Sequence, residues 1–223
     1  MPTELPQEPP DAVRARVLQI VSRQPSPSRR DLRKRSLGWC VLGIALPLAL
    51  FITFGGAEQA TRPWPLIVAT CAGTGALTLL ALAVSLGRTG RTLGPSRAWL
   101  VGVALLFPIL LLVWKVACTA VFEGMMLAWP SRPGLRCFGT SLLYGLCPLV
   151  TFLLARRRSD PVHPAALGAA FGGAGGLWAA TLVDLWCPVG YPVHVVIGHV
   201  APALLLAGLG GFVGARILPP AAP

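Results

Sequence analysis

Long apolar stretches separated by short polar segments dominate the chain. Six of them, at residues 38–56, 65–87, 98–122, 137–155, 164–186 and 195–217, approach or exceed the roughly 20 helical residues that a bilayer core requires. Prolines within the stretches are expected to kink their helices. A helix bundle tolerates such kinks because neighbouring helices can satisfy the freed backbone groups. The prolines are Pro47, Pro108, Pro148 and Pro202. The pattern predicts an all-α integral membrane protein with a bundle of six transmembrane helices over 38–218 and a short tail at 219–223.

Composition supports this fold class. Of the 223 residues, 54% are hydrophobic and only 12% are charged, about half the charged fraction of soluble domains. The mean hydropathy of +0.68 excludes a soluble globular enzyme and a disordered tail. Eight acidic residues and three histidines leave few groups for hydrolytic chemistry, so we predict no enzymatic activity.

Basic residues are distributed unevenly between the two sides of the predicted membrane. Fifteen lie before the first stretch, in alternate loops or in the tail: Arg14, Arg16, Arg23, Arg29, Arg30, Arg33, Lys34, Arg35, Arg88, Arg91, Arg97, Arg156, Arg157, Arg158 and Arg216. The opposite side has Arg62, Arg132 and Arg136, and Lys115 lies within a span. Because basic loops stay inside, both termini are predicted to be cytoplasmic. The run at 28–34 also resembles a twin-arginine export signal, but the apolar stretch after it is of full span length, has no clear cleavage site and is followed by five further spans.

The cytoplasmic head, residues 1–37, is too short to bury a core of its own. Asp11 is a suitable helix start, and apolar residues then recur at helical spacing up to Ser22; they are Val13, Val17, Ile20 and Val21, with Leu18 beside them. Arg14, Arg16 and Gln19 occupy the other faces. This short amphipathic helix needs a cover for its apolar stripe. The bilayer surface and a groove on a soluble protein both fit.

Two of the six cysteines fall at the outer membrane boundary. Cys137 opens the fourth stretch and Cys187 closes the fifth. On an oxidising side, two nearby thiols could pair as a disulfide, or they could capture a soft metal ion as thiolates. His194 and His199 follow closely and could add imidazole nitrogens; the predicted set is Cys137, Cys187 and His199. The spacing matches no common metal motif, so inert thiols or a structural disulfide stay open.

Two ionisable residues lie at membrane depth, where such groups indicate a functional site with a partner. Lys115 in the third stretch and Asp184 in the fifth have similar depths, so they could form an ion pair. The fifth and sixth stretches also carry small residues at intervals of four, such as Gly168, Gly172 and Gly176. This spacing predicts close helix packing.

The C-terminal half, about 130–220, resembles the NrsF-type anti-sigma factors, which are six-span bacterial inner-membrane proteins. The resemblance is carried by Arg132-Pro133-Gly134-Leu135-Arg136-Cys137, Arg156-Arg157-Arg158, Pro164 with the glycine-rich stretch after it, Leu185-Trp186-Cys187-Pro188, His199 and Arg216. The first three spans match only in number and hydropathy, and the head only in position and basic character.

This resemblance implies a function. The head, through Val13, Arg14, Val17, Leu18, Ile20 and Val21, would bind an extracytoplasmic-function sigma factor and mask its polymerase-binding surface. The family's paired outer-face cysteines correspond to Cys137 and Cys187, which are implicated in sensing. The expected partners are then the sigma factor and the lipid bilayer, with no direct nucleic-acid contact and no resident cofactor apart from a transient metal ion at the cysteine pair.

Two other functions compete with this hypothesis. A small transporter or channel would use Lys115 and Asp184. A membrane thiol oxidoreductase would use the cysteine pair, although Cys137 and Cys187 lack the CxxC spacing that tunes thiol reactivity.

Overall fold

The computed structural model describes residues 11–13, 15–16, 19, 29–54, 63–86, 95–122, 134–157, 161–187 and 189–218. The chain divides into two compact units, Met1–Arg35 and Ser36–Pro223. In the first unit, residues 11–13, 15, 16 and 19 are helical and exposed. The second unit contains the apolar helices and both cysteines of the predicted pair.

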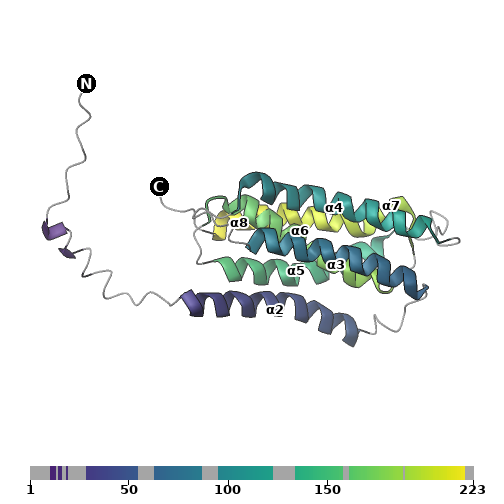
Figure 1. Cartoon of the computed structure of the whole chain (residues 1–223), viewed down its shortest axis with the longest axis horizontal. Coiled ribbons are helices and arrows are strands. Elements are labelled where there is room, and N and C mark those ends of the chain that lie inside the picture. The colour runs from purple at the N-terminus through teal and green to yellow at the C-terminus, as the bar shows by residue number, and fades with distance from the viewer. Residues whose placement is uncertain are drawn as a thin grey trace, which may run out of the picture. The chain divides into compact units, whose positions relative to one another are not determined.

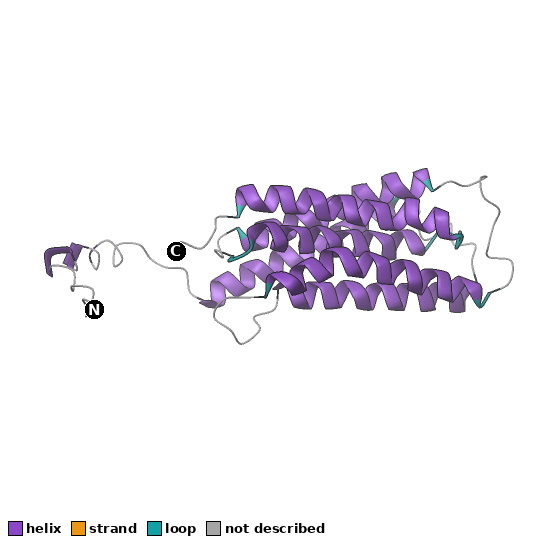
Figure 2. Ribbon diagram, turned by 90° about the horizontal axis from the view of Figure 1, so that it is seen from above, coloured by secondary structure: helices purple, strands orange, loops and turns teal. Residues whose placement is uncertain are grey.

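Within the described residues, six helical segments are long and apolar enough to cross a membrane, and Figure 2 shows helices and loops throughout. The fold class is therefore confirmed. The helices are α2 (Arg29–Thr53), α3 (Trp64–Leu86), α4 (Arg97–Ala120), α5 (Leu135–Arg156) and α6 (Pro164–Asp184), followed by a sixth segment, Pro192–Ile217, made of α7 (Pro192–Val195), the π-helix η2 (Val196–Val200) and α8 (Ala201–Ile217).

The helix α2 begins nine residues before the apolar stretch predicted at 38–56. The residues between Arg29 and Leu37 include no proline or glycine, and Arg, Lys and Leu are good helix formers. The first membrane helix is therefore continuous with the basic segment before it. Hydropathy detected only its apolar part, from Gly38 onward.

Helix α6 lies in the interior of the bundle, where it contacts α3, α4, α5 and α8 (Figure 1). Almost all of its residues are buried, although it is no more apolar than the other spans. Its glycines explain this position: a Cβ atom on Gly168 would lie 2.1 Å from the carbonyl oxygen of Gly210, and one on Gly172 would lie 1.9 Å from that of Leu206. The predicted close packing of the glycine-rich helices is thus confirmed between α6 and α8.

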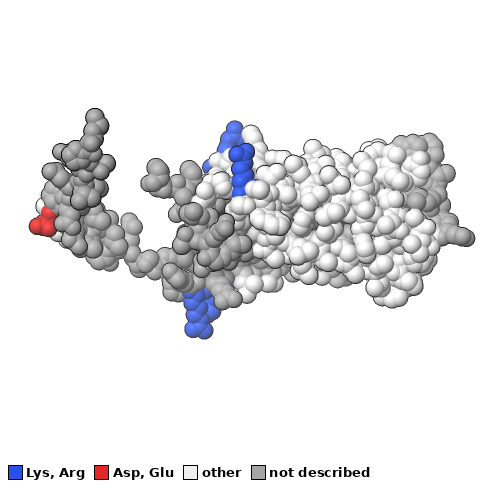
Figure 3. Space-filling view, turned by 45° about the horizontal axis from the view of Figure 1, so that its top comes forward, with Lys and Arg blue, Asp and Glu red and all other residues white. Residues whose placement is uncertain are grey.

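Basic side chains mark one end of the bundle. Arg97 begins α4, Arg156 ends α5, and Arg216 lies in the last turn of α8. On the face that Figure 3 shows, the blue side chains lie at one end, and the length of the bundle is free of them. Because the spans run alternately up and down, Cys137 at the start of α5 belongs to the opposite end.

Candidate functional site

The two predicted cysteines meet at the end of the bundle opposite to Arg97, Arg156 and Arg216. Cys137 lies in the first turn of α5, and Cys187 follows α6 in a turn closed by the bond from its own N–H to the carbonyl of Val183. Their sulfurs are 3.5 Å apart, with the Cys137 thiol as donor, and both residues are free thiols and buried. The predicted proximity of the pair is confirmed.

Both histidines of the sixth span join the pair. The Nε2 atom of His194 is 3.2 Å from the sulfur of Cys187, and the rings of His194 and His199 are 5.9 Å apart. The four possible donor atoms, from Cys137, Cys187, His194 and His199, all lie within 4.8 Å of one another, and all four residues are buried. The predicted metal set is therefore brought together, and His194 is the fourth member that it lacked.

A π-helix explains why the two histidines face the same way. His199 follows His194 by five positions, an offset that in an α-helix of 3.6 residues per turn would point their side chains about 140° apart. In η2 the N–H of Ala201 donates instead to the carbonyl of Val196, five residues back. The wider turn reduces this angle, and such turns are frequently found at functional sites.

Two glycines bring the start of α5 against this segment. Gly134, the N-cap of α5, has a φ of 91°, a left-handed conformation that favours glycine. A Cβ atom on Gly198 would lie 2.9 Å from the Cβ of Cys137, so a larger residue there would push the cysteine away. The close approach also gives the carbonyl of Gly198 a hydrogen-bond donor. In a regular helix the residue four positions later would donate to this carbonyl, but that residue is Pro202, which has no N–H. The Ser141 hydroxyl of α5 donates to it instead, over 3.1 Å.

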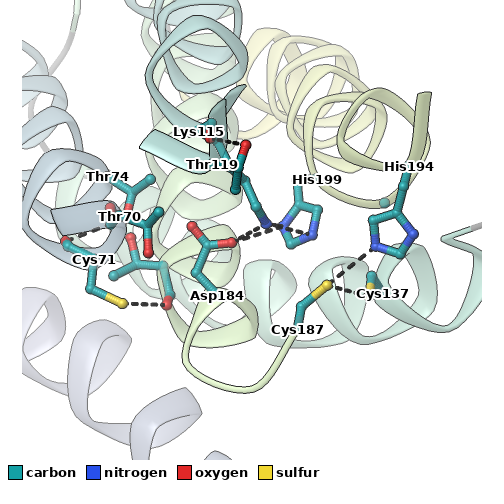
Figure 4. A network of polar contacts seen from close by, with 12 residues as sticks. Thr70, Cys71, Thr74, Lys115, Thr119, Cys137, Asp184, Cys187, His194 and His199 are labelled. Atoms are coloured by element: carbon teal, nitrogen blue, oxygen red, sulfur yellow. Dashed lines mark hydrogen bonds and ion pairs between the residues drawn. The ribbon is translucent and has the colours of Figure 1, made fainter. Parts of the chain in front are cut away.

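A buried ion pair lies beside the cysteine–histidine group (Figure 4). Lys115 from α4 donates to Oδ1 of Asp184 at the end of α6, and both side chains are fully buried. The Lys115 ammonium also lies 3.0 Å from Nε2 of His199, whose Nδ1 is 3.7 Å from the same aspartate oxygen. The predicted meeting of Lys115 and Asp184 is confirmed, and His199 connects the pair to the thiols.

The surroundings of Cys187 favour its thiolate form. Its pKa is lowered well below the ordinary thiol value, first because the Cys137 thiol donates to its sulfur. Burial acts in the opposite direction, whereas the Lys115 charge and hydrogen bonds from His194 and His199 lower the pKa further. The thiolate is the form that binds metals and reacts with oxidants. The group can therefore hold a soft or borderline metal ion, or its two sulfurs can join as a disulfide.

An apolar cluster connects the cysteine pair to α2. It contains both cysteines and Phe51, Tyr144, Ala179, Leu182, Val183 and Val189. Phe51 is almost completely buried, and its ring meets that of Tyr144 edge to face at a centroid distance of 6.2 Å. Trp178 of α6 adds a hydrogen bond of 3.2 Å to the carbonyl of Ile44. The helix that leads to the N-terminal head thus packs on the same cluster as the thiols.

Most of the residues predicted to bind the sigma factor lie outside the described residues. These are Arg14, Val17, Leu18, Ile20 and Val21, whose side chains carry no structural description. Val13 is described, and the residue is 49% exposed.

Residues 21–219 match the family NrsF, described as negative regulator of sigma F. No curated protein and no solved structure matches the chain. The family match covers most of the sequence, including all six spans and the four cysteine and histidine residues. Together with the six-span fold, it shows that the chain belongs to the NrsF family of negative regulators of sigma F.

Proposed function

We propose that this protein is an anti-sigma factor of the bacterial inner membrane that sequesters an extracytoplasmic-function sigma factor. The cytoplasmic head binds the sigma factor through the stripe containing Val13, Val17 and Ile20, and a signal at the outer face releases it. The family description supports the regulatory role and a sigma-factor partner, and it suggests a non-enzymatic protein. The excess of basic residues in alternate loops supports cytoplasmic termini.

One observation supports the outer-face sensor above the others. Cys137 and Cys187 lie in one buried cluster with Phe51 of α2, and α2 is the helix that follows the head. A change in the volume or geometry of the thiol pair can therefore reach a residue of α2 through the packing of this cluster, because packed cores respond to small displacements. For a 100-fold loss of sigma affinity, the two bundle states need to differ by only about 2.7 kcal/mol in binding free energy.

The donor set favours a metal ion as the signal. Two thiolates and two imidazoles are the ligands of tetrahedral zinc sites, and soft metals prefer thiolate. Cys137, Cys187, His194 and His199 provide this set within a buried group. Bound there, the ion would supply a cross-link between α5, the turn after α6 and the sixth span.

Oxidation is the second signal that the geometry permits, because the sulfurs are already 3.5 Å apart. In that reaction the two thiols lose two protons and two electrons as the S–S bond forms. An oxidant of the peroxide class accepts the electrons and is reduced to water. Either signal would alter the distance between α5 and the turn after α6.

The head is tested by capturing the sigma factor with tagged full-length protein from membranes of the native host. The double substitution Val17→Asp with Ile20→Asp should reduce capture at least tenfold, because it places charge on the apolar stripe. The matched control, Gln19→Asp, adds a carboxylate to another face and should retain capture. Unchanged capture after deletion of residues 1–37 would show that the head is not the binding segment.

The sensor is tested in the same membranes by adding cadmium or peroxide and measuring the sigma factor that remains bound. Release should occur with the native protein and with Cys147→Ser, a cysteine on α5 outside the pair. It should be absent when Cys137 and Cys187 are both replaced by Ser. Normal release from this double variant would refute the sensing role of the pair.

A further inference from the structure

We propose that metal binding at the cysteine–histidine group exchanges the hydrogen-bond partner of His199, from Lys115 to Asp184. The exchange carries the state of the outer-face site to α4 and α6. This inference rests on the metal signal of the proposed function and adds the residues that respond to it. Lys115 and Asp184 become positioning residues of a sensor rather than a static ion pair.

The argument begins with the lone pair of His199. An ammonium group only donates hydrogen bonds, so the 3.0 Å contact between Lys115 Nζ and His199 Nε2 uses the single lone pair of a neutral imidazole. A metal ion needs that same kind of lone pair. Whichever ring nitrogen the metal takes, the other then carries a proton, and neither can accept from Lys115. Metal binding and the Lys115–His199 bond therefore exclude each other.

Asp184 provides the new partner. Its Oδ2 atom is buried and has no hydrogen-bond partner among the described residues, whereas its Oδ1 accepts from Lys115. A buried acceptor without a donor is costly. The ring of His199 is already close, with Nδ1 3.7 Å from Oδ1. With the metal on one ring nitrogen, the N–H on the other nitrogen of His199 supplies the missing donor, because metal-bound histidines commonly donate their second N–H to a carboxylate.

Charge selects the class of ion. Two thiolates neutralise a divalent cation, and the Lys115–Asp184 pair next to it is neutral as well. A buried group without net charge avoids the large cost of an unpaired charge in an apolar interior. The site therefore fits a divalent ion of the zinc class, for which Cd²⁺ is a suitable probe because it is soft and binds thiolate.

The exchange has a mechanical consequence because its members lie on three elements. Lys115 belongs to α4, Asp184 ends α6, and His199 lies in η2. When His199 turns to Asp184, Lys115 loses one of its two partners, and the link between α4 and η2 is replaced by a link between α6 and η2. Helix α6 also contacts α5 and α3, so the state of the site reaches the centre of the bundle.

The primary test is nuclear magnetic resonance on native full-length protein in detergent, labelled with ¹⁵N-histidine and titrated with ¹¹³Cd²⁺. The signals of His199 are assigned by their loss in His199→Gln. We expect one ring nitrogen to couple to cadmium and the other to be an N–H, so that neither nitrogen remains an acceptor for Lys115. A His199 that stays uncoupled to cadmium, or that keeps an unprotonated acceptor nitrogen in the cadmium-bound protein, would overturn the proposal.

Substitutions supply a second measurement, the cadmium–thiolate absorbance as a function of Cd²⁺ concentration. Asp184→Asn should weaken binding by about 10–100-fold, the usual effect of removing a partner of a metal-bound histidine, and Asp184→Glu should restore part of the loss. Lys115→Met removes the competitor for His199 and should strengthen binding. Weaker binding in Lys115→Met that retains the native helix content, or no rescue by Asp184→Glu, would contradict the exchange.

These outcomes separate the inference from the proposed function. If the exchange occurs but cadmium leaves the sigma factor bound, the site is a metal centre and the signalling proposal fails. If cadmium releases the sigma factor through the cysteines while His199 keeps its bond to Lys115, the signalling proposal stands and the exchange is wrong.

Discussion

A single methyl group added at Gly172 tests the packing that holds the site together. Its Cβ atom would lie 1.9 Å from the carbonyl oxygen of Leu206, where ordinary contact begins at 3.4 Å. Helices α6 and α8 would therefore have to separate by about 1.5 Å at this point, the difference between those two distances. Backbone atoms cannot rotate away as a side chain does. Overpacking of this kind costs about 1–3 kcal/mol, and we place Gly172→Ala at the upper end of that range.

The matched control is Gly208→Ala on α8, where an added Cβ meets nothing within 4 Å. Alanine is the better helix former by about 1 kcal/mol, so this variant should be as stable as the native protein or more so. The assay is thermal unfolding of the full-length protein in detergent, followed by circular dichroism. A domain of this size shifts its midpoint by about 2–4 °C for each kcal/mol. Equal midpoints for the two variants would refute the reasoning.

Gly172→Ala should also affect the sensor. Helix α6 ends at Asp184 and leads to Cys187, and α8 continues from the π-helix that carries His199. Separating the two helices moves these donors apart. Cadmium binding should weaken in Gly172→Ala and stay unchanged in Gly208→Ala.

Three further predictions concern single side chains of the bundle. His194→Ala should lower cadmium affinity at least tenfold because it removes one of four ligands, whereas His163→Ala, before α6, should leave the titration unchanged. Ser141→Ala should reduce the free energy of unfolding by about 1–3 kcal/mol, because it removes the side-chain donor to a buried carbonyl of the π-helix; Thr140→Ala, whose hydroxyl bonds within its own helix, should cost less than half of this. Trp178→Phe removes a hydrogen bond to the backbone of α2 and should speed amide hydrogen exchange in α2 relative to α3; equal rates would show that this bond does not hold α2.

The apolar pattern was sufficient to predict the fold class and the approximate spans. A membrane helix must be long and apolar, so hydropathy reveals it without knowledge of its neighbours. The same counting placed Cys137 and Cys187 at one end of the bundle, and Lys115 and Asp184 at one depth. Depth along a helix follows from residue number alone, and so the meeting of each pair could be anticipated.

Direction around a helix does not follow from residue number when the helix is irregular. The π-helix at Val196–Val200 turns His194 and His199 toward one site, and the hydrophobic pattern of the segment gives no sign of it. The contact of His199 with Lys115, the orphaned oxygen of Asp184 and the packing of Phe51 near the thiols likewise depend on how the helices are rotated and how closely they approach. The sequence by itself determined which helices cross the membrane and which residues lie at each depth. Only the tertiary structure decided which side chains face one another, because helix rotation is set by packing among glycines, prolines and buried polar groups rather than by hydropathy.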